Sequence, residues 1–96
     1  MSPERAEAYH RVLKTIADVG PSKLLDAEQD RIRYAADNLI FSSRSSDVAA
    51  VDALDDVGRL CRALVDSGRW EEVAAQRLSE DVRHCGPQRT TRLRAA

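Results

Sequence analysis

The residues best suited to chemistry in this chain are two histidines and two cysteines. Cys85 directly follows His84, and a cysteine activated by a histidine is a common nucleophile in enzymes. Adjacent residues of a helix point about 100° apart, however, and catalytic pairs are normally brought together from separate segments. We therefore interpret Cys85 as a small apolar residue at a helix end, where His84 suits the negative C-terminus.

A metal site is the second chemical possibility. Asp81 and His84 are spaced as carboxylate and imidazole at i, i+3, which is half of a di-iron bundle motif, and Glu7 with His10 repeats that spacing. Neither pair falls at the centre of its apolar stripe, where the metal ligands of a bundle must project. Helix-end or solvated ion pairs explain both better, and a metal-binding bundle stays only a second alternative.

The two cysteines could instead form a disulfide, and helical geometry tests this. If the chain turns back on itself at Gly68, Cys61 and Cys85 are offset by about 15 Å along the two helices. A disulfide requires Cα atoms within about 7 Å. We expect two free thiols, which agrees with a reducing compartment.

No sequence motif indicates catalysis. The chain has no GxGxxG, GK[ST], GxSxG, HExxH or CxxC, and its four glycines cannot supply a phosphate-binding loop as well as the helix ends. We expect no catalytic site, no metal and no cofactor. The net charge of −1 also gives no general reason to expect nucleic acid or a membrane surface as partner.

Four amphipathic segments account for most of the 96 residues. Pro3 suits a first helical position, and Gly20 followed by Pro21 predicts a helix end. Asp26 with Gln29 predicts a capping box at the second helix. Short connections favour an all-α, up-and-down antiparallel bundle in a single domain, residues 1–86, followed by a flexible basic tail, 87–96. The predicted helices span 3–19, 27–42, 47–66 and 69–84.

The helix over 47–66 has the widest apolar side, roughly half its circumference, where about 100° suffices for one neighbour. We expect it to be the central helix, with a neighbour on either side. Its acidic row, Asp52, Asp55 and Asp56, lies near the positive helix N-terminus, and Asp55 can pair with Arg59 at i, i+4. A solvated charged side explains this row without any ligand.

The helix over 69–84 carries an apolar stripe with one charge in it. Asp81 lies inside that stripe, and an unpaired buried carboxylate is costly. We expect a pair with Arg77 at the rim of the bundle, although a contact with a partner is a second interpretation. The stripe consists of Trp70, Ala74, Leu78 and Val82.

The helix over 27–42 has aromatic residues on its polar side. Its core side is Ile32, Ala35, Ala36, Leu39 and Ile40, and nearly opposite lie Tyr34 and Phe41, together with Asp30, Arg31, Asp37 and Asn38. Aromatic and arginine side chains are enriched at interfaces. We interpret these six residues as a partner-binding surface. The alternative is that the helix over 3–19 packs across them and makes both aromatics part of the core.

The leading hypothesis is therefore a small non-catalytic protein-interaction module: an adaptor, a regulator or an inhibitor, of the kind that phages and mobile elements carry. Its expected partner is another protein, and a homodimer is the economical outcome because cyclic dimers are the commonest oligomers. The alternative function is a nucleic-acid-associated regulator that binds phosphates through Arg89, Arg92 and Arg94. With no signal peptide and no membrane-spanning run, we expect a cytoplasmic protein.

Overall fold

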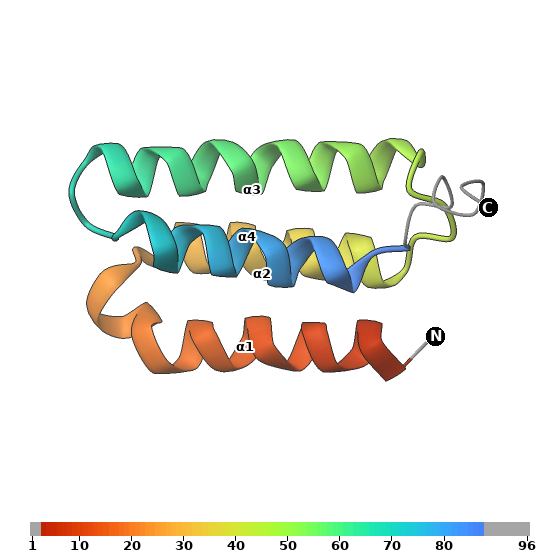
Figure 1. Cartoon of the computed structure of the whole chain (residues 1–96), viewed down its shortest axis with the longest axis horizontal. Helices are drawn as coiled ribbons and strands as arrows, with labels where there is room; N and C mark the ends of the chain where they lie inside the picture. The colour runs from red at the N-terminus through yellow and green to blue at the C-terminus, as the bar shows by residue number, and fades with distance from the viewer. Residues whose placement is uncertain (1–2, 88–96) are drawn as a thin grey trace.

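The computed structural model of the chain describes residues 3–87. Four α-helices run alternately up and down within this part of the chain and form an antiparallel bundle (Figure 1). The predicted all-α bundle is thereby confirmed. The helices are α1 (Pro3–Lys23), α2 (Asp26–Ile40), α3 (Val48–Asp66) and α4 (Glu72–Cys85).

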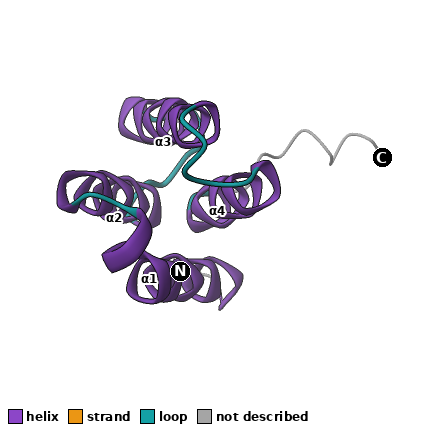
Figure 2. Ribbon diagram, turned by 90° about the vertical axis from the view of Figure 1, so that its left-hand side faces the viewer, coloured by secondary structure: helices purple, strands orange, loops and turns teal. Residues whose placement is uncertain are grey.

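The four helices occupy the corners of the bundle, with α1 and α3 on opposite sides (Figure 2). Helix α3 packs against two neighbours, α2 and α4, as its broad apolar side predicted. It does not touch α1, whereas α2 and α4 each contact all three other helices. The middle of the bundle therefore lies between α2 and α4, and the prediction that α3 is central needs this correction.

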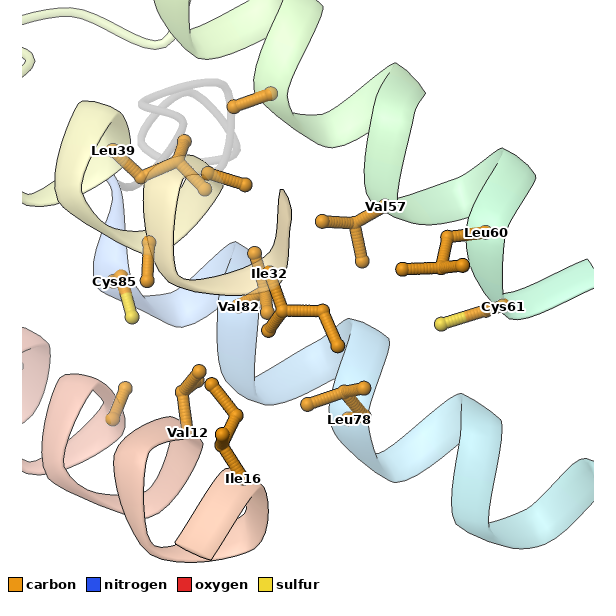
Figure 3. Close-up of a cluster of buried hydrophobic side chains, with 14 of the residues drawn as sticks. Val12, Ile16, Ile32, Leu39, Val57, Leu60, Cys61, Leu78, Val82 and Cys85 are labelled. Atoms are coloured by element: carbon orange, nitrogen blue, oxygen red, sulfur yellow. The ribbon is translucent and has the colours of Figure 1, made fainter. Parts of the chain in front are cut away.

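All four helices contribute to one buried core (Figure 3). The entire predicted core side of α2 is buried. A fully buried Leu, Ile or Val side chain contributes about 1.5–3 kcal/mol relative to an exposed one, so this core supplies the main driving force for folding. Its largest fully enclosed side chains are Ile32, Leu39, Leu64, Leu78, Val12, Val57, Val82 and Cys85.

Helix α1 does not end at Gly20 and Pro21, contrary to the prediction. It continues for one more turn to Lys23, and the N–H of Leu24 donates to the carbonyl of Gly20 at 2.9 Å. Proline removes only one backbone donor, and its fixed φ of about −65° is itself helical. A proline near the end of a helix is therefore compatible with one further helical turn. After this last turn, Leu24 is buried and Leu25 is exposed.

The capping box at the start of α2 was predicted to use Gln29, but the structure forms it with Glu28. The N–H of Leu25 donates to Glu28 Oε1 at 2.9 Å, which satisfies one of the free donors at the helix start. Arg69 donates to both oxygens of the same carboxylate, at 3.0 and 2.6 Å. This nearby guanidinium holds the pKa of Glu28 below its ordinary value. Glu28 thus connects the start of α2 to the turn between α3 and α4.

That turn depends on Gly68, whose φ of +80° lies in the left-handed region. The N–H groups of Arg69 and Trp70 both donate to the carbonyl of Leu64, at 3.1 Å each, and close the end of α3. The chain then runs extended, so α4 begins at Glu72 instead of residue 69. Trp70 is buried as predicted, but Ala74 of the expected stripe is exposed.

At the opposite end of the bundle, one arginine of α1 joins the last turns of two other helices. Arg5 Nε donates to the carbonyl of Cys85 at 2.9 Å. Its Nη2 donates to the carbonyls of Leu39, Ile40 and Ser42, at 2.8, 3.2 and 3.0 Å. A cation is favourable beside the negative C-terminal end of a helix, and this one serves α2 and α4 together. The sequence reasoning had assigned no role to Arg5.

Candidate functional site

The residues predicted to bind a partner lie on the side of α2 that faces away from the core. Tyr34 is 70% exposed and Phe41 is 82% exposed. Helix α1 does not cover them, because it packs into the angle between α2 and α4 (Figure 2). The interpretation that both aromatics are ordinary core residues is therefore wrong. We call the six residues Asp30, Arg31, Tyr34, Asp37, Asn38 and Phe41 the outer face of α2.

One edge of the outer face is held by α1. The hydroxyl of Tyr9 donates a hydrogen bond to Asp37 Oδ1. This bond and burial raise the pKa of the Tyr9 phenol, since ionising it would place two negative charges together. Asp37 is half-buried, so it positions α2 against α1 and is less available to a partner than the sequence suggested.

The other edge is held by α3. Arg31 donates to both carboxylate oxygens of Asp56, with Nη2 at 2.7 Å and Nε at 3.2 Å. The guanidinium lowers the pKa of Asp56. Asp30 pairs with Arg33 at 3.3 Å, and both side chains are exposed. Arg31 is consequently engaged within the chain, and Asp30 is held by an exposed pair, which typically contributes little.

Tyr34 and Asn38 form one wall of a groove between α2 and α3, with a volume of about 420 Å³. The facing wall begins with Val48, which is 74% exposed. The sequence reasoning missed Val48, although the helical wheel contains the signal: Val48 lies nine residues, about half a turn around the helix, from the buried Val57. The remaining lining residues are Ala35, Ala49, Asp52, Ala53 and Asp56.

The two carboxylate–histidine pairs considered as metal ligands, Asp81 with His84 and Glu7 with His10, do not form a metal site among the described residues. Asp81 accepts from Arg11 of α1 at 2.9 Å, and its side chain is only 14% exposed. The prediction that Asp81 pairs with Arg77 is wrong. Its partner is Arg11, 70 residues away in the sequence, which lies beside Asp81 because α1 packs against α4. Within residues 3–87, no three His, Cys, Asp or Glu side chains gather closely enough to hold a metal ion.

Of the three aspartates in the acidic row of α3, one forms an ion pair with another helix. Asp56 pairs with Arg31, whereas Asp52 and Asp55 form no ion pair with any other residue of the described chain. The predicted pair between Asp55 and Arg59 is accordingly wrong. Both unpaired carboxylates lie on the exposed side of α3, where water solvates them.

Both cysteines are free and buried, as the geometry predicted. Burial raises the pKa of the Cys85 thiol to about 12, and the neighbouring Asp81 acts in the same direction. Its Sγ donates to the carbonyl of Asp81 at 3.4 Å. A thiol that stays protonated and enclosed is a poor nucleophile, because the thiolate is the reactive form.

The predicted nucleic-acid contacts Arg89, Arg92 and Arg94 lie outside the described residues, as does the tail from 88 to 96. From Pro3 to Pro87, no helix combines the length and the apolar character that crossing a bilayer demands.

Comparison of the chain with models of protein families, with curated proteins and with solved structures finds no match. The chemistry and geometry of its own residues are therefore the basis for any functional argument.

Proposed function

We propose that this chain is a non-catalytic protein-interaction module whose outer face of α2 binds another protein. The observation that carries the proposal is the exposed aromatic pair of Tyr34, on α2, and Phe41, the C-cap residue that directly follows the last residue of α2. Neither residue belongs to the buried core, and most of their aromatic surface stays exposed. Buried aromatic side chains are the commonest anchors of protein interfaces.

The neighbouring groove strengthens the proposal. Tyr34 lines the groove between α2 and α3, and the exposed Val48 lies on its opposite wall. Three alanines also line the groove, and their small side chains leave space in it. A partner side chain could enter there while Tyr34 and Phe41 are covered from outside. Interfaces of this kind combine an apolar centre with a polar rim, and Asn38 with Asp52 would supply that rim.

The partner we favour is a second copy of the chain. The surface around Tyr34 carries both signs of charge, since Asp30 and Arg33 are exposed beside it. A two-fold interface places the same patch on both subunits, and a patch with both signs can therefore complement itself. An adaptor, a regulator or an inhibitor are all roles that such a module would fill.

Sedimentation velocity over a range of protein concentrations tests this proposal. The wild-type chain is expected to form a reversible dimer. Replacing Tyr34→Ala and Phe41→Ala together is expected to weaken the dimer at least thirtyfold, roughly the 2 kcal/mol of an interface anchor. Because both side chains are exposed, the helical circular dichroism and the thermal midpoint should stay close to wild type.

Val73→Ala is the matched control, because Val73 is a similarly exposed apolar residue on α4. It should leave the association unchanged. An association that survives the double replacement would contradict the assignment of the face. Loss of the helical fold in the double variant would show instead that the two aromatics belong to the structure.

A further inference from the structure

A second groove lies at the other end of the molecule, between the C-terminal half of α1 and the start of α4. It has a volume of about 510 Å³. The turn between α3 and α4 closes one end of it. Residues 15, 19 and 23 follow one side of α1 at i+4 spacing, and residues 74, 77 and 78 face them from α4. This groove shares no lining residue with the outer face of α2.

Apolar side chains line the inner part of this groove. The indole of Trp70 is held in place, because its Nε1–H donates to the carbonyl of Lys23 at 3.4 Å. With its one polar atom satisfied, the small part of Trp70 that stays accessible, 9% of the residue, is apolar, and Val19 and Leu78 line the groove with it. Ala74 occupies the position in the apolar stripe where a larger side chain would fill the space. The Ala74 side chain is a single methyl group, so a larger residue at this position would occupy part of the groove.

Positive charge predominates among the groove's uncommitted side chains. Lys23 and Arg77 line it, and neither forms an ion pair with any residue in the described chain. Arg69 also lines it, but its charge is matched by Glu28. The one acid is Glu71. Two unmatched cations against one carboxylate favour an anionic ligand over a cationic one.

We propose that this groove binds a small amphipathic anion, with an apolar chain against Trp70 and a single carboxylate near Lys23 and Arg77. Binding sites for small molecules combine an apolar lining with a few polar groups that fix orientation, and the groove has both. The proposal is independent of the function proposed for α2. The groove is open to solvent, so we expect weak binding, with a Kd of roughly 0.1–1 mM.

Trp70 is the only tryptophan of the chain, and its fluorescence therefore reports on this groove directly. Decanoate, titrated below its micelle concentration, is expected to change the emission in a saturable way. Decyltrimethylammonium, which has an alkyl chain of similar length and the opposite charge, should bind at least fivefold more weakly. Equal binding of the two probes, or no saturable change with decanoate, would overturn the proposal.

Two variants test the parts of the groove separately. Ala74→Leu should fill it and abolish the decanoate response. Ala17 is also an exposed alanine, on α1 and outside the groove, so Ala17→Leu should leave the response intact. Replacing Lys23 and Arg77 by Gln should weaken decanoate binding roughly two- to fivefold per cation.

Lys14→Gln with Arg62→Gln removes the same charge elsewhere and should leave decanoate binding unchanged. Each of these variants changes exposed side chains, and circular dichroism will verify that it folds. Decanoate binding that persists in Ala74→Leu, or that falls equally in both charge variants, would overturn the assignment of the site.

Discussion

Arg5 offers the sharpest test of how the bundle is held together. Its guanidinium donates to four backbone carbonyls, three at the end of α2 and one at the end of α4. We predict that Arg5→Met, which keeps most of the apolar stem and removes the charged fork, will destabilise the whole bundle.

The magnitude follows from the number of hydrogens. Nε supplies one N–H and Nη2 two, so three hydrogens serve four carbonyls and part of the bonding is shared. A hydrogen bond to a charged group contributes about 1.5–3 kcal/mol, but these bonds are coupled and the site is only part-buried, where water can replace some of them. We therefore expect the free energy of unfolding to fall by about 2–4 kcal/mol.

Urea denaturation followed by circular dichroism measures this loss. Arg62→Met is the matched control, because Arg62 is exposed on α3 and forms no ion pair within residues 3–87; it should stay within about 0.5 kcal/mol of wild type. Arg5→Lys keeps the charge without the planar fork and should recover less than half of the loss. If Arg5→Met is no more destabilising than Arg62→Met, the reasoning about the helix ends is refuted.

Three further predictions concern single positions. Glu28→Gln should cost about 1–2 kcal/mol at pH 7, because Arg69 loses its carboxylate partner. Since the folded pKa of Glu28 lies below its ordinary value of 4.5, its contribution is complete above that pH and is lost as the pH falls through the lowered pKa, so the wild type and the variant should converge in acid denaturation. Gly58→Ala should stabilise the chain by roughly 0.5–1 kcal/mol, because Gly58 lies within α3 with open space around it. Gly68→Ala should destabilise the chain by about 1 kcal/mol, because the φ of Gly68 is +80°. Equal shifts in the thermal midpoint of the two variants would contradict both predictions. Cys85, with a pKa raised to about 12, should react with a thiol reagent at pH 8 only as fast as the bundle opens, and immediate modification would show that it is accessible.

Helical periodicity predicted the parts of the fold that repeat along a helix. All five residues assigned to the core side of α2 are buried, because a 3.6-residue period fixes which side faces inward whatever the neighbours are. The same rule placed Tyr34 and Phe41 on the opposite side. It could not say whether another helix covers them, since that depends on which corner α1 occupies.

Contacts between distant segments could not be predicted in this way. Asp81 has Arg77 one turn before it, and a local rule selects that neighbour, yet the actual partner is Arg11 of α1. Arg5 reads as one charge in an amphipathic helix, and its role appears only when α2 and α4 end beside it. Such contacts are set by how helices dock, which the pattern of a single segment does not contain.

The central claim is that the outer face of α2 joins two copies of this chain in a reversible dimer. Its most direct test is the change in amide chemical shifts of the ¹⁵N-labelled chain on dilution from about 1 mM to about 20 µM, a range that spans the dissociation constants of weak dimers. We predict shifts concentrated in residues 30–41 and beside Val48, which vanish in the Tyr34→Ala, Phe41→Ala variant. Shifts that gather on another surface, or spectra that do not change at all, would contradict the claim.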